Sequence, residues 1–143
     1  FGKKKSFLFL TNILNNYPDK QSLLTYSLEA ISKLAKSCPD DFKIWVKECN
    51  TFNIDTYILS EKEKIQKHAI IILGVLKPPG YIDTIISFLK GNKKSLKENS
   101  LDALSNDDSN KAMSLIRLMQ FDLDQEVAMK ARLIIQTKTL EVE

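Results

Sequence analysis

Glycine and proline are scarce in this sequence, with only four of each among 143 residues. Because both residues concentrate in turns and irregular loops, we expect no long irregular stretch. Apolar runs are also short: none reaches the roughly 18 residues that a membrane-spanning helix needs, so no membrane span is expected. The composition, 43% hydrophobic and 27% charged, is that of a soluble globular protein. We therefore predict a single domain over residues 1–143.

Histidine and cysteine are too few for most metal and nucleophile sites. His68 is the single histidine, and Cys38 and Cys49 do not form a CxxC pair. The sequence contains no zinc-ligand spacing, no Cys/His nucleophile pattern and no phosphate-binding Gly-rich loop. We therefore expect that the protein is not an enzyme and that it binds neither a metal nor a cofactor. The two cysteines are expected to be reduced thiols, which suits a cytoplasmic protein.

The N-terminus superficially resembles a secretion signal, because three lysines precede the apolar residues 7–10. The apolar run ends at Thr11 and no small-residue cleavage site follows, so we favour a helix of the mature protein. Phe1 stands where an initiator methionine would be. We therefore expect the chain to be a segment of a longer protein.

Charge is distributed unevenly along the chain. Residues 1–100 contain 16 lysines against 10 acidic residues, whereas residues 101–143 contain 5 basic and 8 acidic ones. Lysine outnumbers arginine by 19 to 2, which suits solubility more than bidentate phosphate recognition. The basic run Lys90, Lys93, Lys94 and Lys97 has no interleaved aromatic side chain. We therefore favour a solvated loop there over a phosphate-binding surface.

Hydrophobic periodicity predicts helices and no strand. The predicted helices span residues 6–16, 20–37, 40–50, 61–76, 80–90, 93–105, 109–120 and 125–138. Residues 50–59 fit either an extension of the third helix or a short turn. The predicted end signals are a capping box at Ser60 and Glu63, a left-handed C-terminal cap at Gly91, an N-cap at Asp124, and helix-starting carboxylates at Asp40, Asp41, Asp107 and Asp108.

The predicted helices share a register of 31 residues. A large apolar residue recurs at that interval, followed after four residues by a small one and after eight by another large one. The columns are Ile65, Ala69 and Leu73; Leu96, Ser100 and Leu104; Val127, Ala131 and Ile135; and, after an interval of 42, Leu23, Ser27 and Ile31. Since helices approach closely only where the contacting residue is small, this pattern favours stacked helix pairs over a plain bundle.

Residues 122–131, with the sequence DLDQEVAMKA, resemble the second-helix signature of HEAT repeats. That signature places an Asp ahead of the helix, then a Val, then an Ala four residues later, and here these are Asp124, Val127 and Ala131. Two features depart from it: Ala128 stands where an Arg commonly follows the Val, and the third repeat lacks the leading Asp. The resemblance implies an all-α, right-handed α-α superhelix of about four HEAT-like helix pairs.

Helix geometry indicates which side chains would face a partner, because the second helices of such a solenoid line its concave surface. The predicted ladder consists of Glu29, Lys64, Lys67, Ile71, Glu98, Asp102, Met129 and Leu133. With Glu126 included, this surface holds two lysines and four acidic residues. A nucleic-acid groove is basic along its length, so we expect protein partners and no high-affinity DNA or RNA binding.

The N-terminal helix carries apolar residues around its whole circumference. From Phe7, successive rotations of about 100° place Leu8 and Phe9 away from the buried side, whereas a terminal repeat should have a polar outer side. One interpretation is that residues 50–59 or the N-terminal tail cover them. The other is that Leu8 and Phe9 bind an upstream repeat or a second copy of the chain.

The sequence thus predicts a non-catalytic scaffold or adaptor that binds protein partners through the ladder and the apolar N-terminal helix. The resemblance implies two alternatives, since some HEAT-like proteins are DNA glycosylases and some are chromophore lyases. The first alternative would use the Lys-rich segments, and no residue pattern favours the second.

Overall fold

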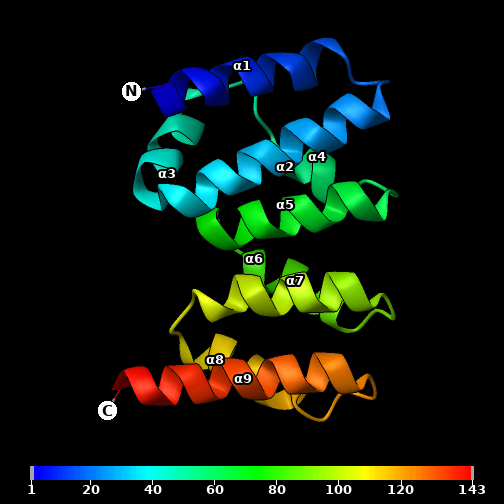
Figure 1. The fold of residues 1–143 in the computed structure, drawn as a ribbon, viewed down its shortest axis with the longest axis vertical. Coiled ribbons are helices and arrows are strands. Elements are labelled where there is room, and N and C mark those ends of the chain that lie inside the picture. The colour runs from blue at the N-terminus through cyan, green and yellow to red at the C-terminus, as the bar shows by residue number, and fades with distance from the viewer. Residues whose placement is uncertain (1, 143) are drawn as a thin grey trace. The chain divides into compact units, whose positions relative to one another are not determined.

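The computed structural model of the protein describes residues 2–142. Nine helices and no strand occur within these residues, so the all-α prediction is confirmed. The helices are α1 (Gly2–Asn16), α2 (Gln21–Ser37), α3 (Pro39–Glu48), α4 (Ile54–Ile58), α5 (Glu63–Leu76), α6 (Tyr81–Leu89), α7 (Lys94–Ser105), α8 (Asn110–Met119) and α9 (Gln125–Val142) (Figure 1). Eight of them occupy the predicted segments. The ninth, α4, lies in the segment 50–59, for which the sequence fits either an extension of the third helix or a short turn.

Two helices are longer than predicted. α1 begins at Gly2 rather than at residue 6, and α9 continues to Val142 rather than ending at residue 138. The first turn of α1 and the last turn of α9 are mostly polar, so they show no hydrophobic periodicity from which a helix boundary could be predicted. The lysines of the first turn of α1 are nevertheless good helix formers. The longer α9 brings Leu140 onto the helix, which matters for the site described below.

Local side chains and backbone geometry set the helix ends. Asp124 Oδ1 accepts hydrogen bonds from the backbone N–H groups of Glu126 (2.9 Å) and Val127 (3.2 Å), so the predicted N-cap of α9 is confirmed. The prediction of a left-handed cap at Gly91 is wrong. α6 ends in a tightened turn in which Gly91 N donates to Phe88 O (3.2 Å), and the left-handed backbone lies instead at Lys77 (φ 45°) and Gly80 (φ 79°).

The chain forms two compact units, one ending at Leu76 and the other beginning at Lys77. The first unit is centred on aromatic side chains. The Phe7 ring lies 5.4 Å from Phe42 and 5.8 Å from Phe52 in edge-on contacts, and 6.1 Å from Trp45 in a stacked contact. Phe52 thereby joins the loop before α4 to the core of α1 and α3, with α2 and α5 lying side by side over it.

All but two positions of the 31-residue pattern are buried, since Leu23 is exposed and Ile135 is half-buried. Ala69, Ser100 and Ala131 are fully buried, as predicted. The first column is wrong in one member, because Leu23 is exposed and Leu24 is buried in its place. The buried stripe of α2 runs through Leu24, Ser27, Leu28, Ile31 and Ala35, and Leu23 lies one residue, about 100°, off that stripe. The single domain and the right-handed superhelix stay predictions.

Candidate functional site

The first unit carries four of the predicted ladder residues. Glu29 is half-buried on α2 and pairs with Lys33 across one helical turn, with 3.4 Å between Oε1 and Nζ. On α5, Lys64 and Lys67 are exposed and Ile71 is half-buried. Because α2 and α5 lie side by side, these residues belong to neighbouring helices of one unit.

The second unit carries the other four, on α7 and α9, which also lie side by side. Glu98 and Asp102 are half-buried on α7, whereas Met129 and Leu133 on α9 keep 58% and 56% of their exposure. Asp102 Oδ2 lies 2.8 Å from Lys130 Nζ of α9. Asp102 is therefore engaged with the neighbouring helix.

An apolar stripe follows from the extended length of α9. Leu140 is exposed and lies seven residues, two helical turns, beyond Leu133, so Met129, Leu133 and Leu140 occupy one side of the helix. The sequence prediction missed Leu140 because it ended the helix at residue 138. The signal that could have found it was the spacing along the sequence, four residues from Met129 to Leu133 and seven from Leu133 to Leu140.

A pocket of about 320 Å³ adjoins this stripe. Residues of α9 and of the segment that ends α7 form its wall: Ser105, Asn106, Lys130, Leu133, Ile134, Thr137, Lys138 and Glu141. Leu133 thus contributes both to the exposed stripe and to the pocket. The pocket combines an apolar side with hydroxyl, amide and charged groups, which is a composition suited to holding a side chain of a protein partner.

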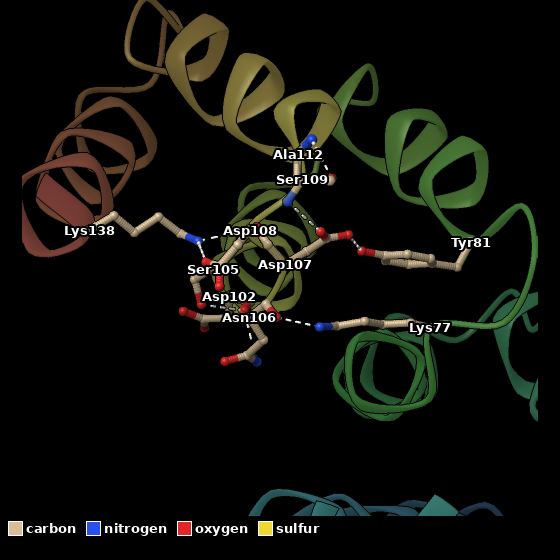
Figure 2. A network of polar contacts seen from close by, with 10 residues as sticks. All are labelled: Lys77, Tyr81, Asp102, Ser105, Asn106, Asp107, Asp108, Ser109, Ala112 and Lys138. Carbon is tan, nitrogen blue, oxygen red and sulfur yellow. Dashed lines mark hydrogen bonds and ion pairs between the residues drawn. The ribbon is translucent and has the colours of Figure 1, made fainter. Parts of the chain in front are cut away.

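The turn between α7 and α8 lies at the centre of a network of polar contacts in the second unit (Figure 2). Lys138 Nζ of α9 donates to Asp107 O (3.2 Å) and lies 3.0 Å from Asp108 Oδ1. Tyr81 donates its hydroxyl hydrogen to the Asp107 carboxylate, and Lys77 donates to the Asn106 carbonyl. The network joins the segment before α6, the start of α6, the α7–α8 turn and α9.

This network has an electrostatic consequence at Tyr81 and Asp107. Burial, together with the bond to Asp107, raises the pKa of Tyr81 above its ordinary value. Burial acts to raise the pKa of Asp107 as well, but hydrogen bonds from Tyr81 and Ser109 and the charge of Lys77 outweigh it and lower that pKa. Asp107 acts as a structural acceptor just ahead of α8. The predicted helix-starting role of Asp107 and Asp108 falls instead to Ser109, which caps α8, because Asp107 accepts from the Ser109 N–H and not from an amide of the helix.

The basic run at residues 90–97 is partly neutralised within the chain. Lys97 Nζ lies 3.0 Å from Asp122 Oδ1, and Lys94 forms an ion pair with Glu126. Lys90 and Lys93 are exposed. Two of the four lysines are thus committed to carboxylates of the last helix pair, which leaves a weaker phosphate-binding surface than the sequence alone indicates.

Leu8 and Phe9 keep 45% and 64% of their exposure on α1. The interpretation that residues 50–59 cover them is wrong, because Phe52 of that segment packs on the opposite, buried Phe7. Residues 2–5 belong to α1, and Phe1 lies outside the described residues. The outward apolar side of α1 is therefore available to another molecule.

The remaining candidates for chemistry are isolated side chains. His68 is half-buried, and burial lowers its pKa, as do the charges of Lys67, Lys33 and Lys36, whereas Glu29 opposes them. Cys38 and Cys49 are free thiols. Within residues 2–142 no three His, Cys, Asp or Glu side chains come together as a metal site.

None of the helices within the described range combines the length and hydropathy that crossing a bilayer requires. No protein-family model, curated protein or solved structure matches the chain.

Proposed function

We propose that the chain is a non-catalytic protein-interaction scaffold, built as a right-handed solenoid of HEAT-like helix pairs and working in the cytoplasm. The observation that carries this proposal is the exposed apolar stripe of Met129, Leu133 and Leu140 on α9. Full burial of such a side chain contributes roughly 1.5–3 kcal/mol of favourable free energy. Because Met129 and Leu133 are about half exposed, binding of a partner over them could still gain about half of that amount for each. The buried small residues of the 31-residue pattern support the stacking, and the free thiols suit a reducing compartment.

The surroundings of the stripe resemble the anatomy of a protein interface. The stripe is flanked by the Lys130–Asp102 ion pair, and the adjoining pocket is bordered by Lys138 and Glu141. An apolar centre with a charged rim is typical of interfaces in which a few side chains supply most of the affinity. We therefore assign the partner-binding role to Met129 and Leu133, with Leu140 extending the same surface.

The nucleic-acid alternative has less support. Binding through the Lys-rich segments would require the lysines of residues 90–97 to release counterions by contacting phosphates. Lys97 is largely enclosed and paired with Asp122, and Lys94 is paired with Glu126. Phosphate binding would have to compete with these carboxylates.

The test is affinity capture from native lysate with the 143-residue chain as bait, before and after nuclease treatment. Met129→Lys/Leu133→Lys should lose the captured proteins, because two charges replace the apolar contact. Leu118→Lys/Leu123→Lys is the matched control, since both residues are exposed in the same unit and lie outside the stripe. Nuclease should leave the capture unchanged. Equal loss from both variants, or loss on nuclease treatment, would overturn the assignment.

A further inference from the structure

The exposed sides of α2 and α5 in the first unit carry a cluster of lysines. Lys33 and Lys36 come from α2, and Lys64 and Lys67 come from α5, with His68 next to Lys67. Two acidic residues accompany them, Glu29 on α2 and Glu63 in the first turn of α5, so four lysines and two glutamates leave a net charge of +2. We call these six charged residues the α2–α5 basic face.

The lysines of this face are mostly unneutralised. Lys33 pairs with Glu29, but Lys36, Lys64 and Lys67 form no ion pair with any described residue. The second unit differs, because several of its lysines are joined to carboxylates: Lys94 to Glu126, Lys97 to Asp122, Lys111 to Asp83, Lys130 to Asp102 and Lys138 to Asp108. Three lysines without an ion pair therefore lie on the α2–α5 basic face.

Three of these lysines act on His68. Its imidazole lies within electrostatic reach of Lys33 and Lys36 across the helix pair and of Lys67 on its own helix. Their combined effect, added to that of burial, lowers its pKa even though Glu29 opposes it. Nδ1 of His68 is buried and has no hydrogen-bond partner in the described structure. Lys33, Lys36 and Lys67 thus lie close to one side chain.

We propose that the α2–α5 basic face docks an acidic peptide segment of a protein partner, an inference that rests on the proposed scaffold function and names the chemistry of one of its ligands. Two of its lysines, Lys64 and Lys67, are about 4.5 Å apart along the helix axis. The basic residues of the face are all lysines, which bind single carboxylates as point charges rather than phosphates in a bidentate fork. Half-buried Ile71 adds an apolar contact one turn beyond Lys67.

A nucleic acid fits this face less well. A strand that follows a basic groove needs positive charge over several nucleotides and aromatic platforms for its bases. Glu29 lies within the cluster and repels any anion beside it, so a continuous phosphate backbone would pass next to a repelling carboxylate, whereas a single acidic side chain could contact a lysine away from Glu29. The proposal therefore commits to a peptide and makes an oligonucleotide the competing outcome.

The probe is a short fluorescent peptide of alternating Glu and Ala, compared with a Gln–Ala peptide of equal length. Fluorescence anisotropy should report binding of the first alone, with an affinity that falls as salt shortens the Debye length. Lys64→Glu/Lys67→Glu should weaken binding by about tenfold or more, since two attractions become repulsions. Lys90→Glu/Lys93→Glu applies the same change of charge to exposed lysines of the other unit and should change the affinity by less than about twofold.

Backbone amide shifts in the wild-type chain give a second readout that needs no variant. The Glu–Ala peptide should shift the amides around Lys36, Lys64, Lys67 and His68 and leave those around Met129 and Leu133 unmoved. Equal weakening by both pairs of substitutions, shifts spread over both units, or tighter binding of an oligothymidylate that displaces the peptide would overturn the proposal. Capture through Met129 and Leu133 is tested separately, so a failure here leaves the scaffold function standing.

Discussion

Lys97 of α7 lies 3.0 Å from Asp122 in the connection between α8 and α9, and the two side chains are only 15% and 12% exposed. Asp122 Oδ2 also accepts a hydrogen bond from the Asp124 backbone N–H (3.0 Å). The pair therefore links α7 to the segment whose Asp124 caps α9. It joins two successive helix pairs through a contact that water reaches poorly.

Replacing Lys97 by Gln should destabilise the protein by about 1–3 kcal/mol, because a largely enclosed carboxylate loses its cation. Lys94→Gln breaks the neighbouring pair with Glu126, whose side chains are more exposed, and should cost much less. Urea unfolding of the two variants measures the difference. Equal, small losses would mean that the Lys97–Asp122 contact is no stronger than a surface pair.

Ser100 is fully buried among the small residues of the 31-residue pattern, and its hydroxyl has no hydrogen-bond partner in the described structure. Ser100→Ala should raise the free energy of unfolding by about 0.5–1 kcal/mol, since an unsatisfied buried hydroxyl is removed and Ala is the better helix former. The same substitution at Ser109, whose Oγ accepts from Ala112 N (3.2 Å) as the cap of α8, should lower it by about 1 kcal/mol. Chemical denaturation should therefore show changes of opposite sign in the free energy of unfolding of the two variants. A destabilising Ser100→Ala would contradict this prediction.

His68 should titrate below its ordinary pKa of 6.5, chiefly because of burial. Lys67→Gln removes a charge that lowers this pKa and should raise it, whereas Glu29→Gln should lower it further. The unfolded chain binds a proton at a higher pH than the folded one, so the contribution of His68 to stability is lost as pH falls from 6.5 through the folded pKa. Imidazole shifts followed by NMR measure both effects, and a wild-type pKa at or above 6.5 would contradict them.

Leu8 and Phe9 should mediate association of α1 with another copy of the chain. Wild-type protein should sediment with a concentration-dependent mass, because burying the two exposed side chains is favourable. Leu8→Lys/Phe9→Lys should sediment as a monomer and unfold at the same temperature as a dilute wild-type sample, since neither residue belongs to the core. If both proteins remain monomers at every concentration, α1 holds no self-association surface.

The helices were predictable because each long one has a continuous apolar stripe and several carry end signals such as Asp124. Short α4 was not, since five residues are too few to show a helical period. Leu23 was placed inward by aligning α2 with the other helices across a longer connection, and an error of one residue there turns a side chain by about 100°.

The candidate site was only partly predictable for a related reason. Exposure of Met129 and Leu133 follows from the pattern of a single helix, and it was inferred from the sequence. The ion pairs of Lys97 with Asp122 and of Lys130 with Asp102 join residues 25 and 28 positions apart. Such pairs depend on how helices lie against each other, so charge counts along the chain overestimated the basic character of residues 90–97.

The most direct measurement is photo-crosslinking from position 133. A photoreactive phenylalanine analogue at Leu133 should form adducts with proteins of native lysate, in nuclease-treated and untreated samples alike. The control is the same analogue at Leu59, which is exposed on the other unit and outside any assigned surface. Adducts at 133 that exceed those at 59 and disappear when Met129 is changed to Lys are the expected result. Equal labelling at the two positions, or adducts that nuclease removes, would contradict a protein-binding role for α9.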